Sequence, residues 1–223
     1  LMRNQYFSAG YPPVEFCGQI YTQTIDVQYE LRDPQQNKKF YKHTKPILRL
    51  DSTLNIDGYF GTYPPDYPEK GVYAYHLSPC LYENNERLYF AFPGSEYIGW
   101  FHRDSSTTSS LEFASSFDVG YHPMDTADFM QISKAVQFQD TVSRYSQIGY
   151  SGLHDKIARI YSRHTSIHFN NNVFNVSVIV GSAQNGNVDR EYLLTADRYK
   201  QTRMIFMEKG LLLLEYLENE EAE

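Results

Sequence analysis

The sequence predicts an all-β fold, a single antiparallel β-barrel or sandwich with long loops rich in Tyr and Pro and with little helix. Short apolar or alternating segments recur along the 223 residues and are separated by Gly, Pro and Asn turn signals. Residues 24–31 alternate without interruption between apolar and polar side chains, which is typical of a half-buried strand. Residues 202–217 hold two apolar runs around a polar turn with Gly210, a pattern that indicates a β-hairpin in the core.

The same patterns predict the other elements in chain order. Residues 1–18 form an extended arm of a single domain that spans 1–223, and 218–223 form an acidic C-terminal tail. Strands are expected at 24–31, 47–50, 54–60, 72–77, 87–92, 97–102, 111–119, 166–169, 173–180 and 191–195, before the hairpin. Polar and Pro-rich stretches predict loops at 33–37, 61–71 and 103–110 and a turn at 184–187.

The segment from 125 to 163 has an ambiguous pattern. Within it, residues 156–161 predict a short helix, because Ile157, Ile160 and Tyr161 would share one helical face. Even with this helix, we expect less than about 15% helix, against roughly 30–35% in an average domain.

Charge and composition exclude several classes of partner. The formal net charge is −7 with no basic stripe, so nucleic acid is not an expected partner. No apolar run reaches the ~18 residues of a membrane span, so no membrane insertion is expected. The opening Leu1-Met2-Arg3 suggests a segment of a longer protein.

Cys17 and Cys80 are too few for a disulfide framework or a Cys-based zinc site, and two unpaired thiols are expected rather than one bridge.

No residue pattern supports a catalytic, cofactor-binding or metal-binding site. His164 and His168 would share a face of a helix, but their neighbours favour a strand. Cys17 has no basic neighbour that would favour a thiolate, Ser151 lacks a G-x-S-x-G setting, and no Gly-rich phosphate loop occurs. We therefore expect no enzyme and no cofactor. The alternative is a hydrolase of the glycosidase or protease type that uses a carboxylate pair or Cys17.

Tyrosine recurs in segments rich in Ser, Thr, Asn, Pro and Gly. These tyrosines are Tyr63, Tyr67, Tyr73, Tyr75, Tyr97, Tyr121, Tyr145 and Tyr150. Tyrosine gives a large contact area, keeps a hydroxyl group for hydrogen bonding and is enriched at interfaces. Tyrosine also fits a sheet face that is partly exposed to water. Two interpretations of these tyrosines therefore stay open, a binding interface and an ordinary sheet surface.

The C-terminal run 211–217, followed by the acidic residues 218–223, and the Tyr/Pro-rich loops resemble the capsid spike domain of astroviruses. The resemblance covers the chain in outline and transfers no individual residue. It implies a dimeric β-barrel on the virion surface, made in the host cytoplasm, that binds a host-cell receptor, either a protein or a glycan, and is recognised by neutralising antibodies. A structural shell protein built from a jelly roll is a further alternative.

The expected contact surfaces are a twofold interface and an exposed loop. A tyrosine-rich domain with many short strands must cover or pair its edges, and closed twofold dimers are the commonest assemblies, so we expect a homodimer. For receptor binding the sequence suggests Trp100, Arg103 and Asp104, because Trp and Arg are favoured hot spots and these residues begin the polar loop at 103–110. A position of Trp100 in the core is the alternative.

Overall fold

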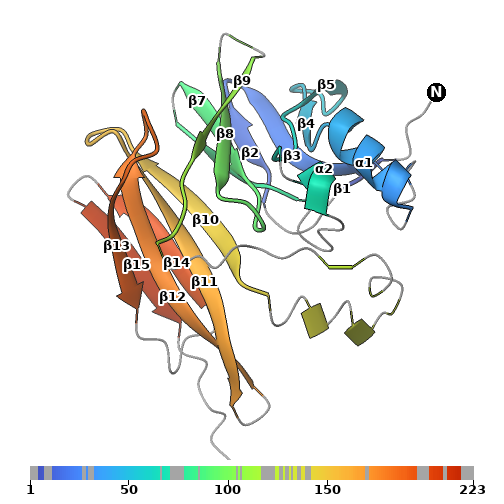
Figure 1. The fold of residues 1–223 in the computed structure, drawn as a ribbon. Helices are drawn as coiled ribbons and strands as arrows, with labels where there is room; N and C mark the ends of the chain where they lie inside the picture. Colours follow the sequence, from blue (N-terminus) through green and yellow to red (C-terminus); the bar gives the residue numbers. More distant parts are fainter. Residues whose placement is uncertain are drawn as a thin grey trace, which may run out of the picture.

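A computed structural model describes residues 5–7, 12–26, 29, 33–65, 67–70, 78–84, 86–103, 105, 107–116, 124–125, 128, 131, 133–134, 137–138, 142–168, 171–194, 201–207 and 210–216 (Figure 1). The all-β prediction is confirmed, since the strand content is 52% and the helix content is 12%. The sheets pack face to face as in a sandwich, and the described strands form no closed barrel.

Antiparallel sheets follow one another along the chain. The first sheet contains β1 (Gln5–Phe7), β2 (Val14–Phe16), β3 (Gln19–Asp26), β4 (Ile47–Leu50) and β5 (Ile56–Phe60). The second contains β6 (Cys80–Glu83), β7 (Arg87–Ala91), β8 (Tyr97–His102) and β9 (Thr108–Glu112). The third contains β10 (Arg144–Ser151), β11 (Lys156–His168), β12 (Asn171–Ser182) and β13 (Val188–Leu194), and β14 (Gln201–Met207) with β15 (Gly210–Tyr216) forms the terminal hairpin.

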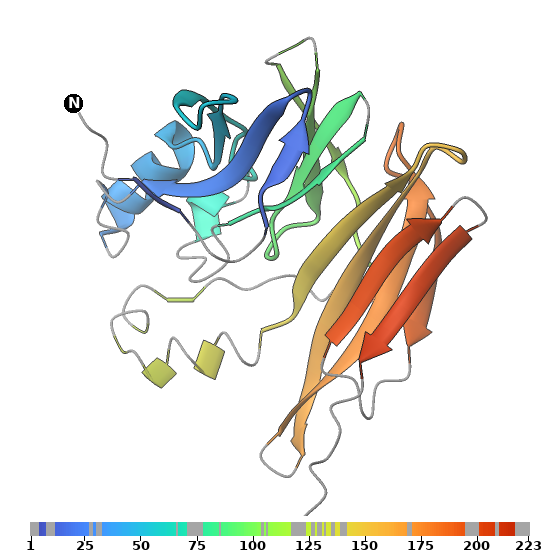
Figure 2. The same ribbon diagram turned by 180° about the vertical axis from the view of Figure 1, so that it is seen from behind.

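Each four-stranded sheet is an up-and-down meander, and successive sheets meet at their first strands. Strand β2 lies beside β6, β6 beside β10, and β10 beside β14. In the first sheet, β1 and β2 share the position of the first strand, because they pair with consecutive parts of β3. This arrangement, with meanders that fan out from neighbouring first strands, is that of the blades of a β-propeller. Figure 2 shows the terminal hairpin, in red, over the third sheet.

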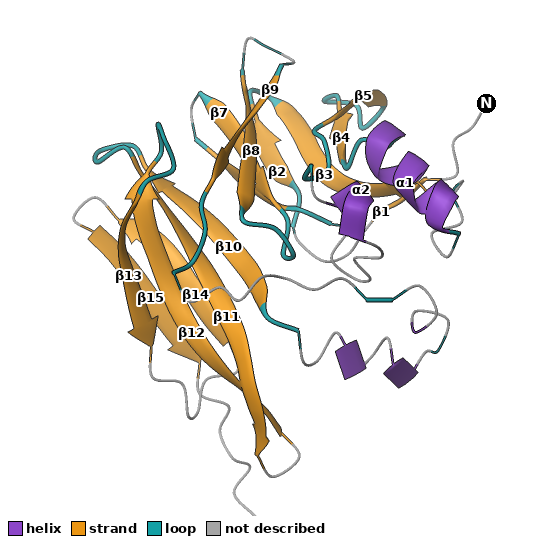
Figure 3. Cartoon of the chain, in the orientation of Figure 1, coloured by secondary structure: helices purple, strands orange, loops and turns teal. Residues whose placement is uncertain are grey.

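The second sheet has a hydrophobic core on each of its faces. Its Leu88, Phe90 and Phe101 pack toward the first sheet and the two helices, α1 (Pro34–His43) and α2 (Tyr67–Lys70), which lie beside the first sheet (Figure 3). The members of this core are mainly aromatic: Phe16, Tyr21, Phe40, Tyr41, Tyr63, Tyr67 and Phe92, with Ile47. Alternate residues of the same strands, Tyr89 and Ile98 among them, pack against the third sheet.

Arg159 on β11 joins the third sheet to the second. Its side chain is 1% exposed, and its guanidinium donates hydrogen bonds to the main-chain oxygens of Phe92 and Ser95, both at 2.8 Å. Its Cζ also lies 4.1 Å from the centre of the Tyr145 ring. Buried carbonyl groups need partners, and here the guanidinium of the neighbouring sheet adds to the Ser95 N–H, which also donates to the Phe92 oxygen at 3.2 Å.

Glu191 on β13 makes a second connection. Its carboxylate accepts hydrogen bonds from the hydroxyls of Ser115 (2.5 Å), Ser116 (2.7 Å) and Ser177 (2.5 Å) and from the Ser116 N–H (2.7 Å). Burial raises the pKa of this carboxyl, but the hydrogen bonds from Ser115, Ser177 and Ser116 outweigh burial and leave the pKa below its ordinary value. The ionised carboxylate therefore holds the segment after β9 against the third sheet.

We expect Glu191→Gln to lower the free energy of unfolding by about 2 kcal/mol near pH 7, because the amide loses acceptor capacity that the hydroxyl donors use. The folded-state pKa is depressed, so this stabilisation is present above the unfolded pKa and is lost as the pH falls through the folded pKa. Urea unfolding should thus show a smaller difference between variant and wild type near pH 3 than near pH 7. A difference of equal size at both pH values would contradict the assignment, and Glu112→Gln, at an exposed position of β9, is the control.

Predictions about helix were wrong in three places, and one of them is the short helix α2, which lies inside the predicted loop at 61–71. The predicted loop at 33–37 is the start of α1: Asp33 is the N-cap and accepts a hydrogen bond from the Gln35 N–H, and Pro34 occupies the first turn, where its missing N–H costs nothing. The predicted helix at 156–161 belongs to β11 instead. Ile157 and Ile160 lie on opposite faces of that strand, and both faces are buried, so the apolar spacing imitates a helix.

Several strand boundaries also differ from the prediction. Strands at 47–50, 97–102 and the terminal hairpin agree closely with β4, β8, β14 and β15, whereas β6 and β10 were missed. The predicted strand at 111–119 begins earlier, at Thr108 inside the predicted loop at 103–110, and stops at Glu112. Residues 117–119 lie outside the described residues. The predicted strand at 24–31 begins earlier, at Gln19, and the predicted arm contributes β1 and β2 to the first sheet. The predicted strand at 72–77 and the tail at 218–223 lie outside the described residues.

The loop tyrosines and the cysteines complete the comparison with the sequence. Tyr63, Tyr67 and Tyr145 are buried in the cores, whereas Tyr97 and Tyr150 are half-buried. Tyr73, Tyr75 and Tyr121 lie outside the described residues.

Cys17 is exposed, Cys80 is buried, and both thiols are free, as predicted. Within the described part of the chain, neither helix has the length and apolar character needed to cross a bilayer.

Candidate functional site

Two clusters that combine aromatic and charged side chains lie where the sheets meet. Both lie toward the same end of the sheets, at the top of Figure 1. In the second sheet, for example, this end carries the turn between β6 and β7 and the turn between β8 and β9. The first is the Arg49 cluster, formed by Gln19, Tyr21, Arg49, Asp57 and Phe60. The second is the Trp100 cluster, formed by Tyr82, Arg87, Tyr89, Trp100, Tyr150 and Asp155.

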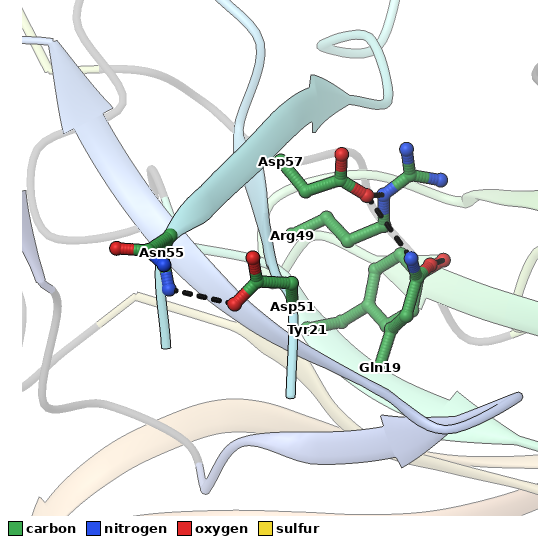
Figure 4. Close-up of polar contacts among 6 residues, drawn as sticks. All are labelled: Gln19, Tyr21, Arg49, Asp51, Asn55 and Asp57. Carbon is green, nitrogen blue, oxygen red and sulfur yellow. Dashed lines mark hydrogen bonds and ion pairs between the residues drawn. The ribbon is translucent and has the colours of Figure 1, made fainter. Parts of the chain in front are cut away.

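The Arg49 cluster is a closed set of polar contacts (Figure 4). Arg49 Nε lies 2.8 Å from Asp57 Oδ2, and the same oxygen accepts a hydrogen bond from Gln19 Nε2 at 3.0 Å. The Tyr21 hydroxyl donates to Gln19 Oε1 at 3.4 Å, and the Arg49 guanidinium lies 4.4 Å from the centre of the Phe60 ring. Burial raises the pKa of Tyr21, while the nearby Arg49 opposes that change.

A β-bulge explains how Asp57 reaches Arg49. The pairing of β4 with β5 shifts between Arg49 and Leu50, so that Gly58 faces Arg49 and Ile56 faces Leu50. Asp57 is the extra residue, and a bulge of this kind redirects one side chain relative to ordinary alternation. The rings of this cluster belong to an aromatic core, because Tyr21 packs against both Phe16 and Phe101, so the polar contacts of Gln19, Arg49 and Asp57 lie at the edge of that core.

The loop between β4 and β5 is held by Asp51 (Figure 4). Asp51 Oδ1 accepts hydrogen bonds from the Thr53 N–H (2.8 Å), the Thr53 hydroxyl (2.7 Å) and the Asn55 N–H (2.9 Å). These bonds from Thr53 and Asn55 lower the pKa of Asp51 below its ordinary value, despite a small opposing effect of desolvation. The loop that they order carries Leu54 in a left-handed conformation, with φ of 64°.

The Trp100 cluster lies between the second and third sheets. Register places Tyr82 opposite Tyr89 and Tyr89 opposite Trp100, so three aromatic residues form a row across the second sheet. The Tyr150 ring, from β10, stacks on Tyr89 with centres 5.7 Å apart and planes at 25°. The Arg87 guanidinium lies 5.8 Å from the centre of the Trp100 ring. Tyr89 is buried, whereas the other members of the cluster are half-buried.

Hydrogen bonds fix Tyr150 within this cluster. Its hydroxyl donates to Asp155 Oδ1 at 3.0 Å, and its main-chain oxygen accepts from the Tyr82 hydroxyl at 3.2 Å. Burial, and then the neighbouring Asp155, raises the pKa of Tyr150 to about 12. The Tyr150 hydroxyl therefore stays neutral at physiological pH and can donate a hydrogen bond. The aromatic row is thus uncharged and lies between the guanidinium of Arg87 and the carboxylate of Asp155.

The structure describes two of the three residues that the sequence suggested for binding. Trp100 is half-buried on β8 and packs with Arg87 and Tyr89 rather than standing on a loop. Arg103 follows β8 and is exposed, with its N–H bonded to the Glu86 main-chain oxygen at 2.9 Å. Asp104 lies outside the described residues. Nothing in the sequence marked Arg87 and Asp155 as members of a site. The one available signal was the alternation in residues 87–92 and 97–102, from which Tyr89 could have been placed beside Trp100 on neighbouring strands.

The remaining candidates for chemistry contribute no assembled site in the described part of the chain. There, no three His, Cys, Asp or Glu residues lie together as metal ligands would. Cys17 occupies the exposed turn between β2 and β3, and burial raises the pKa of the Cys80 thiol to about 11. An open cavity of about 460 Å³ lies at the start of α1, where Asp33 already caps the helix.

Comparison with known proteins gives a fold but no family assignment. No family model and no curated protein matches the sequence. The crystal structure of a DUF4221 family member from Bacteroides vulgatus is similar, with a TM-score of 0.72 and 17% sequence identity. The match covers 91% of this chain and 56% of the Bacteroides chain, so this chain spans just over half the length of that protein.

This neighbour corrects the predicted function. It is a bacterial protein, which points away from a viral capsid spike and from a location on a virion surface. The predictions of host-cell attachment and of antibody recognition are wrong for the same reason. The meanders also differ from a jelly roll, whose strands follow two Greek keys.

Proposed function

We propose that this chain is a non-catalytic binding domain whose Trp100 cluster binds a neutral glycan. The observation that carries the proposal is the row of Tyr82, Tyr89 and Trp100, extended by Tyr150 from the next sheet and flanked by Arg87 and Asp155. Three of these four residues, Tyr82, Trp100 and Tyr150, are half-buried rather than buried, although they carry some of the largest apolar side chains.

The chemistry of the cluster fits a pyranose ring. The C–H groups of a sugar face carry partial positive charge and pack on the negative face of an aromatic ring, while the hydroxyls need directional donors and acceptors. Arg87 provides donors, Asp155 provides acceptors, and the Tyr150 hydroxyl remains neutral. The rings come from two packed sheets, so their positions are set before a ligand arrives, which reduces the entropy cost of binding.

The net charge of the chain favours a neutral ligand. With a formal charge of −7, the protein repels anions at long range, so uronic and sialic acids are disfavoured. Sites for small ligands are mostly apolar and aromatic with a few polar groups that set orientation, and the Trp100 cluster has this composition.

We expect neutral oligosaccharides of glucose, mannose or galactose units to change the tryptophan fluorescence of the protein. Trp100 is its single tryptophan, so the emission reports on this cluster alone. Calorimetry should show that Trp100→Ala weakens binding by at least about tenfold, whereas Trp100→Phe, which keeps a stacking ring, retains most of the affinity.

Tyr192→Ala is the matched control, since Tyr192 is an exposed aromatic residue on β13 outside the cluster, 47% exposed. Its affinity should equal that of the wild type. Two results would overturn the proposal: no response to any neutral oligosaccharide in the panel, or undiminished binding by a folded Trp100→Ala variant.

A further inference from the structure

We infer that the solvent-facing side of helix α1 is a docking surface for an acidic segment of a partner protein. The inference does not depend on the proposed glycan site. This surface, the basic face, is formed by exposed cationic residues of α1 and by one that follows it: Lys38, Lys39, Lys42, His43 and Lys45. Residues 34–45 contain no acidic residue, although the chain as a whole has a formal charge of −7.

The helix brings these cationic side chains together. Phe40 and Tyr41 are buried in the aromatic core beside the first sheet (Figure 3). Lys38, Lys39 and Lys42 lie on the opposite side of α1, because residues three and four positions apart share one helical face. The sequence analysis expected no basic stripe, since the start of this helix was predicted as a loop. The observed helix corrects that expectation and gives an acidic chain one basic surface.

The stability of the helix accounts for only part of this charge. Lys42 and His43 occupy the last turn, where cations interact favourably with the helix dipole. Lys38 and Lys39 lie in the middle of α1, outside that turn, and Lys38 is one turn from Lys42, so their like charges repel each other. The ion pairs of the described residues are made by cations outside the basic face, namely Arg49, Lys134 and Lys156. A partner that carries carboxylates would neutralise the charge of this face.

An acidic peptide fits the basic face better than a membrane or a nucleic acid does. An amphipathic helix binds a bilayer through exposed apolar side chains, whereas Phe40 and Tyr41 of α1 are buried. Single-stranded nucleic acid binds through aromatic residues that stack on bases, and the basic face has no aromatic residue. The negative charge of the whole chain also repels extended polyanions and charged bilayers more strongly than it repels a short segment.

The spacing of the lysines matches that of an extended acidic segment. Lys38 and Lys42 are separated by ~6 Å along the helix axis, and alternate residues of an extended chain are ~6.6 Å apart. Carboxylates at alternate positions of the segment can therefore each face one lysine. The open cavity at the start of α1 continues this surface, since Lys39 and Gln35 are among its lining residues. Asp33 also lines the cavity, so we expect the residues of the segment that reach it to be uncharged.

The test is fluorescence anisotropy of a fluorescein-labelled oligoglutamate peptide, titrated with the 223-residue chain. We expect binding at about 50 mM NaCl that weakens at least ~10-fold at about 500 mM NaCl, because salt screens exposed charges. The double variant Lys38→Gln, Lys39→Gln should bind at least ~10-fold more weakly than the wild type. Gln has nearly the helix propensity of Lys, so the midpoint of urea unfolding should be no lower than that of the wild type. A lower midpoint would show that these lysines serve the fold and would overturn the inference.

The double variant Arg103→Gln, Arg190→Gln is the matched control. It removes the same amount of positive charge from exposed positions after β8 and on β13, and it should bind the peptide like the wild type. The inference would be overturned by a wild type that does not bind oligoglutamate, or by equal weakening in the two double variants. Binding to an oligothymidylate of the same length, or to vesicles that contain phosphatidylserine, as tightly as to the peptide would also overturn it.

Discussion

Replacing Arg159 with alanine should lower the free energy of unfolding by about 4 kcal/mol, enough to leave a domain of ordinary stability partly unfolded. The variant loses two charge-assisted hydrogen bonds and leaves the main-chain oxygens of Phe92 and Ser95 without these donors, and both residues are buried. Buried acceptors that lose their donors cost more than the bonds contributed. The contact with the Tyr145 ring is lost as well.

Urea unfolding, followed by circular dichroism, measures this effect. Arg159→Lys should give an intermediate loss, about 2 kcal/mol, because one ammonium group cannot serve both carbonyl oxygens with the geometry of a guanidinium. Arg190→Ala, at an exposed position of β13, is the control and should change stability by less than about 0.5 kcal/mol. A loss below ~1 kcal/mol in Arg159→Ala would show that the buried guanidinium does not hold the two sheets together.

Replacing Gly186 with alanine should cost about 3 kcal/mol, the second largest effect that we expect. Gly186 has φ of 75°, and an added Cβ would lie 2.2 Å from the Glu112 main-chain oxygen. Both the left-handed conformation and the collision with backbone oppose the substitution. The collision cannot be relieved by a rotamer change, so either the turn between β12 and β13 or the end of β9 must move.

Gly18 provides a control that isolates the steric contribution. Its φ of 73° is nearly the same, but an added Cβ would have no neighbour within 4 Å. Gly18→Ala should therefore cost only about 1 kcal/mol, the conformational part of the effect. Thermal or urea unfolding of both variants gives the comparison, and equal losses at the two positions would contradict the collision with Glu112.

The sequence predicted the class of the fold because local patterns determine most of the strands. Turn signals such as Asn185-Gly186 and the alternation in residues 173–180 depend only on neighbouring residues, and both agree with the structure. The helix at 34–43 was missed although Asp33 and Pro34 form a helix start signal, because Pro was interpreted as a loop marker. The helix prediction for residues 156–161 was wrong because a strand that is buried on both faces lacks the alternation of apolar and polar residues by which strands are identified.

The candidate site could be predicted only in part. Trp100 was identified from its residue type, but its environment depends on register, which places Tyr89 beside it, and on sheet packing, which brings Tyr150 from about fifty residues away. The pairing of Asp57 with Arg49 depends on a bulge that interrupts alternation. Neither packing between sheets nor a bulge leaves a sign in the sequence that single-residue reasoning can detect.

The two hydrophobic cores on the second sheet have a consequence for how the protein opens. The first sheet can detach by breaking one core, whereas β7, β8 and β11 carry buried residues on both faces and can be exposed only when the cores on both sides are lost. The slowest amide hydrogens should therefore lie in β7, β8 and β11, and partly unfolded forms should lose the first sheet before these strands. The middle of the stack, which also carries Trp100, is thereby the last part of the molecule to lose its shape.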